Sequence, residues 1–342
     1  MKVQYLSTRR DEDCGISEYT SMLEDEIDIS TDRTEVRLGA IAPVHYFTQM
    51  IKFVRSDADV LHVQHEYGIW GPKSIMSWFV FPILVLFRLL SEKPVIMTFH
   101  SAWSKDTISP PYSKVKLMYV IINNIMLSLS CDHAFFLSEE TKREFEKTTT
   151  VSSTVLSHGV YSQIHPLSQP EARDRLNIPA GDVWCLPGFI RPVKGHDLFV
   201  ELAKNNPDKE FVVGGGTQGQ AHVEFEEKLK QEAPDNVTFT GVLNSDEFHW
   251  LFSAVDLAVL PYRTVSQSGI LNMCAAYNLP TVTTDLDRFS ELEDNYGWPQ
   301  TLSTDELLKF DGNLNNHRDG ISAYKSENGM EQVITAHMEI YG

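Results

Sequence analysis

The chain has 342 residues, of which 42% are hydrophobic and 22% charged, and its formal net charge is -18 at pH 7. This composition is typical of a globular protein and argues against a disordered chain. The length exceeds what one hydrophobic core usually supports, so we expect two domains of roughly 150 residues each. An acidic surface lacks the basic footprint that nucleic acids require, so we expect no nucleic-acid partner, although a local basic pocket can still hold a small phosphate ligand.

The cysteines and the apolar segments point to a protein of the reducing cytoplasm. Four cysteines stand without CxxC spacing, which disfavours a zinc site and a disulfide framework, so we expect buried thiols: Cys14, Cys131, Cys185 and Cys274. Met1 and Lys2 lead directly into a strand-like segment, which leaves no room for the apolar core of a signal peptide. The most apolar stretch, residues 75–90, contains Pro82 and Arg88 and is shorter than the ~20 residues of a bilayer span.

Short apolar segments alternate with amphipathic ones, which is typical of strand-helix-strand units around parallel sheets. In the first half we predict strands at residues 3–6, 36–38, 60–63, 95–99, 134–137 and 154–156. The first helix has the clearest pattern, because Ile16, Tyr19, Leu23 and Ile27 recur at helical spacing behind Gly15. Gly15 is therefore expected at a strand-loop-helix junction.

A second series of strands follows a segment rich in proline and glycine, residues 161–182, where we place the domain boundary. We predict strands at residues 183–186, 210–213, 237–240, 257–260 and 281–283, and helices that begin near Gly195, Gln220, Ser245 and Ser268. Each half is thus predicted to be a Rossmann-like α/β domain. We expect the first domain over residues 1–165, the second over 166–321, and a terminal helix, 322–342, that packs back on the first domain.

The run LPYRTVSQSG, Leu260 to Gly269, indicates an anion-binding loop. An apolar strand precedes it, and Ser268 with Gly269 opens an apolar segment that we predict to be a helix. The first N–H groups of a helix lack intrahelical partners, and the helix dipole adds about half a positive charge there, so such a start binds phosphate. The alternative is an ordinary strand-to-helix turn that Ser266 or Ser268 caps.

Two further segments of the second half point to phosphate. The run PGFIRPVKGHD follows a predicted strand and places Arg191 and Lys194 three residues apart, just before a helix. An arginine fork and a mobile lysine charge together suit a diphosphate leaving group, while the alternative is two solvated loop cations. Residues 214–216, three glycines after the next strand, would let a ligand approach the backbone. All these groups lie at carboxyl ends of predicted strands, where open parallel sheets bind ligands.

In the first half, Gly15 and His100 occupy comparable positions at strand ends. His100 could donate a hydrogen bond to a sugar hydroxyl or to a developing charge, and the alternative is a structural histidine. The string HVQHEYG does not indicate a metal site, because His62 and His65 would lie on opposite faces of a strand and the spacing is not that of a helical zinc motif.

The chain resembles the retaining GT-B glycosyltransferases of family 4 over nearly its whole length. The resemblance lies in the order and spacing of seven segments: DCGISEYT at Asp13, ADVLHVQHEYGIWG at Ala58, PVIMTFHSAW at Pro94, LSHGV at Leu156, FIRPVKGHD at Phe189, NVTFTGVL at Asn236 and LPYRTVSQSGILNMCAAYNLPTVTTD at Leu260. It implies the GT-B fold, in which two Rossmann-like domains with parallel sheets face a central cleft. The first domain, 1–165, would lie on the acceptor side, and the second, 166–321, would bind the nucleotide-sugar donor.

The resemblance also implies an activity. A hexose would pass from a nucleoside-diphosphate sugar to a hydroxyl of a glycan or lipid-linked acceptor, with retention of anomeric configuration and without a metal or other cofactor. Arg191 and Lys194 would hold the donor diphosphate, and His100 would contact the transferred sugar. The remaining donor-binding positions that it implies are Gly15, Gly215, Val242, Leu243, Ser268 and Gly269, of which Val242 and Leu243 would meet the nucleotide base through their backbone.

One departure from the family pattern leaves alternatives open. Many members carry two glutamates eight residues apart around the start of this helix, and here the corresponding positions, near Val265 or Ser266 and near Met273 or Cys274, are not acidic. Either a different sugar-binding arrangement around the SQSG loop replaces the pair, or the chain is a non-catalytic nucleotide-sugar-binding partner subunit. A sugar-nucleotide epimerase of the same fold is a third alternative.

Contact with a membrane surface is a separate hypothesis. Residues 114–129 combine Lys114 and Lys116 with apolar side chains, and together with residues 75–90 they could offer an apolar, partly basic surface. The alternative is a crossover helix buried against the sheet. We therefore expect a cytoplasmic protein for which peripheral attachment to the inner membrane face stays open, with the net negative charge counting against strong attachment.

Overall fold

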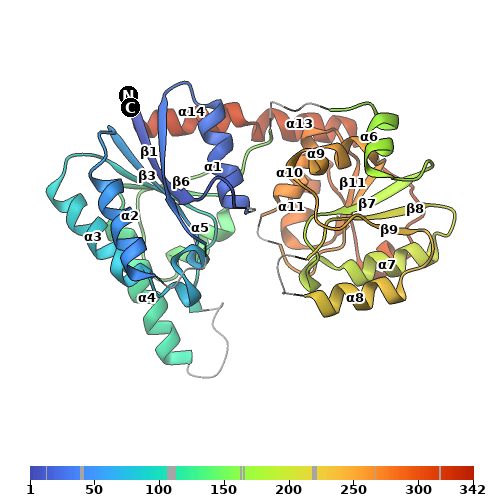
Figure 1. The fold of residues 1–342 in the computed structure, drawn as a ribbon, viewed down its shortest axis with the longest axis horizontal. Coiled ribbons are helices and arrows are strands. Elements are labelled where there is room, and N and C mark those ends of the chain that lie inside the picture. The colour runs from blue at the N-terminus through green and yellow to red at the C-terminus, as the bar shows by residue number, and fades with distance from the viewer. Residues whose placement is uncertain are drawn as a thin grey trace. The chain divides into compact units, whose positions relative to one another are not determined.

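The computed structural model describes residues 1–12, 14–38, 42–105, 113–161, 164, 166–217, 222–265, 267–315 and 317–342. The chain divides into two compact units, coloured along the chain in Figure 1. Unit 1 consists of Met1–Gly159 and Met330–Gly342, and unit 2 of Val160–Gly329. Each unit contains a six-stranded sheet whose assigned strand pairs are all parallel, which confirms the predicted α/β class.

The sheet of unit 1 has the order β2-β1-β3-β4-β5-β6. Its strands are β1 (Lys2–Thr8), β2 (Ser30–Val36), β3 (Val60–His65), β4 (Val95–Phe99), β5 (His133–Phe136) and β6 (Ser153–Val155). Its helices are α1 (Gly15–Glu26), α2 (Pro43–Val54), α3 (Ser77–Leu90), α4 (Ser113–Ser130), α5 (Glu139–Glu146) and α14 (Met330–Tyr341), and two short 3₁₀ turns, Tyr67–Trp70 and Pro72–Ser74, lie between β3 and α3.

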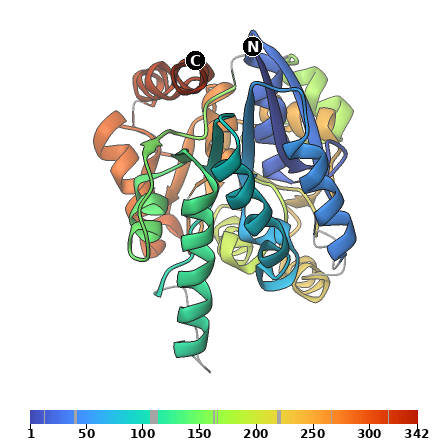
Figure 2. The same cartoon turned by 90° about the vertical axis from the view of Figure 1, so that its left-hand side faces the viewer.

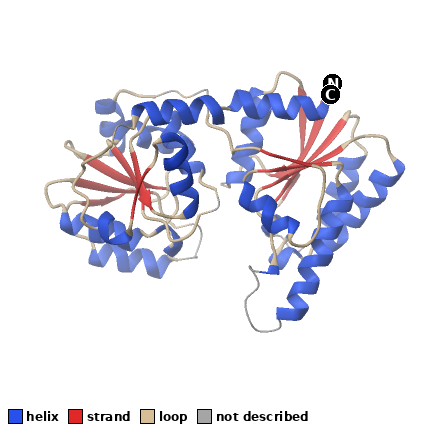
Figure 3. Cartoon of the chain, turned by 180° about the vertical axis from the view of Figure 1, so that it is seen from behind, coloured by secondary structure: helices blue, strands red, loops and turns tan. Residues whose placement is uncertain are grey.

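The sheet of unit 2 has the order β12-β11-β10-β7-β8-β9. Its strands are β7 (Val183–Pro187), β8 (Glu210–Gly214), β9 (Val237–Phe239), β10 (Leu257–Leu260), β11 (Thr281–Thr284) and β12 (Gln300–Leu302). Its helices are α6 (Gln169–Leu176), α7 (His196–Asn205), α8 (Val223–Glu232), α9 (Ser245–Ala254), α10 (Gly269–Ala276), α11 (Asp287–Tyr296), α12 (Thr304–Leu307) and α13 (Arg318–Asn328). Figure 3 shows blue helices on both faces of each red sheet, so the central strands are covered on both sides.

The apolar segments formed the predicted strands because both faces of the central strands are buried. All six residues of β3 and all five of β4 are buried. Burial on both faces explains the nearly continuous apolar sequence of β4, whereas β3 buries the polar side chains of His62, Gln64 and His65 among its apolar ones. The first helix also forms as predicted: Tyr19 and Leu23 are fully buried, and the Cys14 side chain caps the helix by accepting from the Ser17 N–H at 3.4 Å.

Two strands differ from the prediction. The second strand was predicted at residues 36–38 but runs over Ser30–Val36, paired with β1 from Lys2 to Thr8. Its sequence STDRTEV is mostly polar because β2 is an edge strand and exposes part of its length. The short strand β12 was not predicted, because its three half-buried residues carry no periodic pattern. The helix expected near Gln220 is α8, which begins at Val223, and Gln220 lies outside the described residues.

The boundaries of the units also differ from the expected ones at 165/166 and 321/322. The first crossing lies between Gly159 and Val160, and the tail forms two helices that belong to different units. In α13, Ile321 and Tyr324 belong to the core of unit 2, whereas α14 is in unit 1. Only the segment from Met330, not the whole tail from residue 322, therefore packs with unit 1.

Strand order determines where each unit can bind a ligand. In unit 1 the chain leaves β1 for β2 on one side and then continues at β3 on the other. In unit 2 it proceeds from β7 through β8 to β9 and then returns to β10 on the opposite side of β7. The loops after two such neighbouring strands diverge and leave a crevice at their carboxyl ends. The predicted phosphate-directed segments of unit 2 follow β7 and β10. These are the neighbouring strands between which the direction of strand order reverses, and we call this place the switch point.

Candidate functional site

Two loops at the switch point of unit 2, residues 188–194 after β7 and 261–268 after β10, are bound to each other. The Arg263 N–H donates to the Val193 carbonyl at 2.8 Å, and the Arg263 guanidinium donates to the Pro192 carbonyl at 2.7 Å. The same guanidinium forms a bidentate pair with the Asp197 carboxylate at 2.8 and 2.6 Å. Because Asp197 lies in the first turn of α7, this arginine ties the β10 loop to the helix that follows the β7 loop.

The ammonium of Lys194 lies where these elements meet. A Cβ atom on Gly188 would lie 2.6 Å from Lys194 Nζ and 3.2 Å from Ile270 Cδ1, so this glycine, with φ +98°, leaves the space that the ammonium occupies. Lys194 Nζ is also 5.7 Å from the centre of the Tyr262 ring. Lys194 therefore stands between the β7 loop, the end of β10 and the first turn of α10.

Lys194 carries a positive charge that the protein itself does not neutralise. Across the described ranges it has no carboxylate within ion-pair distance. Burial and the positive charge of Arg191 lower the pKa of Lys194 to about 8. Two cations drawn together without a carboxylate for the lysine form a site that a bound anion would stabilise.

The first turn of α10 adds hydrogen-bond donors to the same place. Ser268 is the N-cap, and its hydroxyl accepts from the Leu271 N–H at 3.1 Å, so capping by Ser268 is confirmed; Ser266 lies outside the described residues. In the part of the chain that the structure describes, the N–H groups of Gly269 and Ile270 have no acceptor. A Cβ on Gly269 would have no atom within 4 Å, so open space adjoins these amides.

Packing of backbone against backbone explains the three glycines after β8, residues 214–216. The Gly188 N–H donates to the Gly214 carbonyl and the Ile190 N–H donates to the Gly216 carbonyl, both at 2.9 Å. Gly215 has φ +155°, and a Cβ there would lie 2.5 Å from the Gly188 carbonyl oxygen. The triplet thus allows the β7 and β8 loops to approach at the backbone, and this close contact explains the glycines without a ligand.

The predicted base-contacting segment lies beside this triplet. A Cβ on Gly216 would be 2.9 Å from the Val242 backbone nitrogen, and the Val242 side chain is 58% exposed. Leu243 is half-buried against the core of unit 2. Unit 2 therefore brings together, around the ends of β7, β8 and β10, the predicted residues Arg191, Lys194, Gly215, Val242, Leu243, Ser268 and Gly269.

The other two predicted residues, Gly15 and His100, lie at carboxyl ends of strands in unit 1. Gly15 begins α1, and a Cβ on it would have no atom within 4 Å. His100 follows β4, where its N–H donates to the His65 carbonyl at 3.0 Å. Burial, with smaller contributions from His158 and His65, lowers the pKa of His100 to about 3, so the ring is neutral at pH 7.

Gln64 determines which nitrogen of His100 carries the proton. Gln64 Oε1 lies 2.9 Å from His100 Nε2, and a carbonyl oxygen can only accept, so Nε2 carries the proton. The Nδ1 atom of the neutral ring then keeps its lone pair and can act only as a hydrogen-bond acceptor. The sequence suggested a histidine that donates, whereas this hydrogen bond favours one that accepts.

Three further polar side chains around His100 were not found from the sequence. Tyr19 Oη, Gln64 Nε2 and His158 Nδ1 are buried without a hydrogen-bond partner among the described residues. The Tyr19 ring packs edge-on against His100, with centres 5.2 Å apart, and the His158 ring lies 4.8 Å from Tyr19. The only sequence signals were Gln64 within HVQHEYG and His158 within LSHGV, and neither has catalytic spacing.

The two histidines of the HVQH string have structural partners. His62 Nε2 is 2.8 Å from the Thr98 hydroxyl, and its Nδ1 is hydrogen-bonded to Tyr341 of α14. His65 Nδ1 accepts from the Trp70 indole N–H at 2.9 Å. No group of three or more possible metal ligands occurs within the described ranges. The four cysteines are free thiols, and three of them are buried while Cys14 is half-buried.

The positions of the absent glutamate pair are now partly defined. Met273 and Cys274 lie within α10 and are 4% and 0% exposed. Burial raises the pKa of the Cys274 thiol to about 12, which indicates how strongly this environment disfavours a negative charge. Val265 is half-buried, and Ser266 lies outside the described residues. An acidic side chain at residue 274 would therefore require a different packing of α10.

Comparison with known proteins finds glycosyltransferases that are similar in sequence to part of this chain. Residues 182–305 match the family Glycosyl transferases group 1. A stretch of 154 residues is 32% identical to the lipopolysaccharide core biosynthesis mannosyltransferase LpsB of Rhizobium meliloti, and it covers 42% of this chain and 43% of that protein. A stretch of 144 residues is 30% identical to the alpha-galactosylglucosyldiacylglycerol synthase of Streptococcus pneumoniae, covering 39% and 37% of the two chains. The chain thus spans about two fifths of the length of these curated relatives.

Comparison of structures extends over the whole chain. The crystal structure of Anabaena HepE in complex with UDP and glucose superposes with a TM-score of 0.73 at 12% identity, covering 99% of each chain. At this identity the match concerns the fold, and it confirms the GT-B architecture. Residues 182–305 therefore match the glycosyl transferases group 1 family, within a chain that has the GT-B fold.

Proposed function

We propose that this protein transfers a hexose from a nucleoside-diphosphate sugar to a hydroxyl of a glycan or lipid-linked acceptor. The observation that carries the proposal is the Lys194 ammonium, half-buried without a carboxylate partner at the switch point of unit 2 and beside the open first turn of α10. A diphosphate supplies the negative charge that this place lacks. The names of the relatives support a sugar nucleotide as its source, since HepE binds UDP and glucose and LpsB is named a mannosyltransferase.

The proposed chemistry needs charge stabilisation more than a protein base. As the bond between the sugar and the diphosphate breaks, negative charge grows on the leaving oxygen. Lys194, Arg191 and the N–H groups of Gly269 and Ile270 stabilise this charge, which is the task that a metal ion performs in other enzymes. A departing phosphate oxygen then takes the proton of the acceptor hydroxyl. Retention of configuration and independence of a metal follow from the family resemblance and belong to the proposal.

The absent glutamate pair supports a second candidate, a subunit that binds nucleotide sugars without turning them over. Residue 274 is a fully buried cysteine, so this position offers a ligand no acidic side chain. Binding of a sugar nucleotide without turnover across a broad acceptor panel would favour this candidate. An epimerase would instead convert the donor without any acceptor, which nuclear magnetic resonance of the donor alone detects.

The test of the transferase proposal is the Lys194→Ala variant. We expect kcat/KM for transfer from the preferred nucleotide sugar to fall by about 10²–10³-fold, because one group that stabilises the leaving charge is lost. Purified protein is assayed with a panel of nucleotide sugars and with saccharide and polyprenyl-linked acceptors. The matched control is Lys228→Ala, since that lysine is 68% exposed on α8 of the same unit. Transfer that survives in Lys194→Ala at the control rate contradicts the assignment.

We further propose peripheral contact of unit 1 with an anionic membrane. Within the described residues no helix is long and apolar enough to span a bilayer. Helices α3 and α4 nevertheless expose large apolar side chains, which reach 72% exposure at Leu89 and 79% at Leu90. Lys73, Lys114 and Lys116 are exposed and add positive charge near these helices. Figure 2 shows the first turns of α4 extending beyond the sheet of unit 1.

A further inference from the structure

A second basic site lies in unit 1, in a pocket of about 530 Å³ formed by the ends of β1 and β2 and by α2. Its lining includes the basic side chains of Arg9, Arg33, Arg37 and Lys52, together with His45. The chain as a whole has 47 acidic and 29 basic residues, so four basic side chains around one pocket oppose its general composition. None of these residues belongs to the donor site proposed above.

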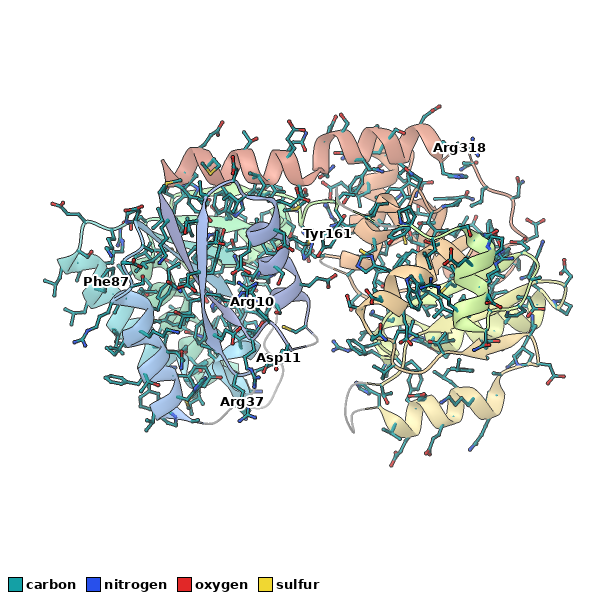
Figure 4. The ribbon with its side chains drawn as sticks, turned by 45° about the horizontal axis from the view of Figure 1, so that its top comes forward. Arg10, Asp11, Arg37, Phe87, Tyr161 and Arg318 are labelled. Carbon is teal, nitrogen blue, oxygen red and sulfur yellow. The ribbon has the colours of Figure 1, made fainter. Side chains whose placement is uncertain are left out.

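Two of the four cations are neutralised within the protein. Arg33 is buried and pairs with the Glu24 carboxylate, and Arg9 pairs with Asp11 at 2.6 Å. The only acidic residue in the lining, Glu35, accepts a hydrogen bond from the Arg10 N–H at 3.1 Å. Figure 4 shows Arg10 and Asp11 at the end of unit 1 where Arg37 also lies.

The other two cations, Arg37 and Lys52, outnumber the single carboxylate of the lining, Glu35, so the pocket keeps an excess of positive charge. Both side chains are exposed, and the described part of the chain contains no ion-pair partner for either. His45 adds a donor to them: its Nε2 accepts from the Arg37 backbone N–H at 3.2 Å, so the proton of a neutral ring is on Nδ1. The pocket thus offers an arginine fork, a mobile ammonium and an imidazole N–H.

These groups have the chemistry of a phosphate site. Arginine binds phosphate oxygens in pairs, and lysine supplies a point charge that adapts to the ligand. The volume of about 530 Å³ falls within the range of small-molecule pockets and leaves room for a phosphate that carries a further group.

We infer that this pocket binds the phosphate or diphosphate group of a phosphorylated acceptor. That the ligand is the acceptor rests on the proposed transferase function. The presence of an anion site in unit 1 does not depend on that function. A lipid-linked diphosphate and a soluble sugar phosphate share the chemistry that the pocket recognises. The two units then hold the two phosphate-bearing substrates, the donor on Lys194 and the acceptor on Arg37 and Lys52.

Isothermal titration calorimetry with inorganic pyrophosphate tests the pocket independently of activity. We expect two binding events in the wild-type protein, one of which the variant Arg37→Ala/Lys52→Ala weakens at least tenfold. The Lys194→Ala variant should retain that event and lose the other. The control Arg55→Ala/Arg318→Ala removes the same charge from exposed residues outside the pocket. Circular dichroism and thermal melting verify that each variant is folded, and a pocket variant whose titration superposes on that of the control overturns the inference.

Flotation with vesicles separates the two sources of the phosphate. Vesicles of phosphatidylcholine with and without 30% phosphatidic acid are compared for the pocket variant and its control. A lipid-borne group predicts that Arg37→Ala/Lys52→Ala floats less with the anionic vesicles than the control does. A soluble phosphate predicts equal flotation together with the calorimetric loss. If no acceptor panel supports transfer while pyrophosphate still binds to the pocket, the transferase proposal fails and the ligand is not an acceptor. The anion site itself is then still supported.

Discussion

At the scale of single residues, the pKa of Lys194 makes donor binding dependent on pH. This pKa is lowered to about 8, so the side chain is charged below pH 8 and loses its proton as the pH rises through that value. A bound diphosphate stabilises the charged form, and its affinity must fall when the free protein no longer carries the charge.

The corresponding prediction concerns binding of the nucleoside diphosphate of the preferred donor, measured by calorimetry at pH 7, 8 and 9. We expect the affinity of the wild-type protein to fall between pH 8 and pH 9, by up to about tenfold per unit, because one proton is linked to binding. The variant Lys194→Arg stays charged in this range and should lose the pH dependence while retaining binding. A wild-type affinity that is constant from pH 7 to pH 9 contradicts this role of Lys194.

Gln64 is a positioning residue in the proposed transfer reaction, since its Oε1 holds the Nε2–H group of His100. Replacing it by leucine removes the acceptor that holds Nε2–H, and we expect kcat to fall by about ten- to a hundredfold with the donor KM unchanged. The variant Gln64→Glu keeps an acceptor at the same place and should restore most of the activity at neutral pH. If both variants lose activity equally, Gln64 has only a packing role.

At the scale of elements, Arg263 connects loops that belong to different strands. It binds the Val193 and Pro192 carbonyls and the Asp197 carboxylate, so the loops after β7 and β10 are held together before any ligand arrives. The Arg263 and Asp197 side chains are each 43% exposed, and solvent screening therefore limits the contribution of their ion pair to stability to about 1 kcal/mol or less. The pair should matter more for the geometry of the site than for the fold.

This distinction predicts different effects of Arg263→Ala on binding and on stability. We expect the midpoint of urea unfolding to change little, while the affinity for UDP decreases by about tenfold because the two loops lose their common anchor. The control is Arg288→Ala, which removes an ion pair with Glu291 on α11 of the same unit. Equal affinities in the two variants would show that the loops keep their geometry without Arg263.

At the scale of the whole molecule, acidic composition and a local apolar surface have opposite consequences. The net charge of -18 repels an anionic membrane, whereas burying the exposed leucines of α3 in lipid is favourable. The inner faces of α3 and α4 are packed, with Phe81, Leu84 and Leu127 fully buried, so these helices form a stable support for their exposed faces. The alternative of a crossover helix packed on the sheet therefore describes one face of each helix and leaves the other face accessible.

Flotation with vesicles containing 30% anionic lipid tests this surface. We expect the wild-type protein to bind and Leu89→Ser/Leu90→Ser to bind about tenfold more weakly, because two exposed leucines are lost. Leu38→Ser is the control, since Leu38 is 40% exposed outside α3 and α4. A wild-type protein that stays with the unbound fraction rules out membrane contact through these helices.

The fold could be predicted from the sequence to the extent that burial leaves a pattern. Both faces of β4 are covered, so its apolar sequence identified it, and the helical spacing of Tyr19 and Leu23 identified α1. The edge strand β2 was misplaced because its polar residues are set by pairing with β1, which local sequence does not report. The return of the chain to unit 1 was predicted too early, at residue 322 instead of Met330, since membership of α13 in unit 2 and of α14 in unit 1 depends on the core that each helix joins.

For the functional site, the sequence by itself determined which segments follow strands and which of them carry cations, because strand ends and charges are local properties. Only the tertiary structure decided that Lys194 lies against Gly188 and Tyr262 without a carboxylate partner, that Gln64 orients His100, and that Arg37 and Lys52 share one pocket. These relations join residues from different strands and loops. Hydrogen bonding, burial and electrostatic interaction depend on distances in space, and strand order rather than sequence spacing sets those distances.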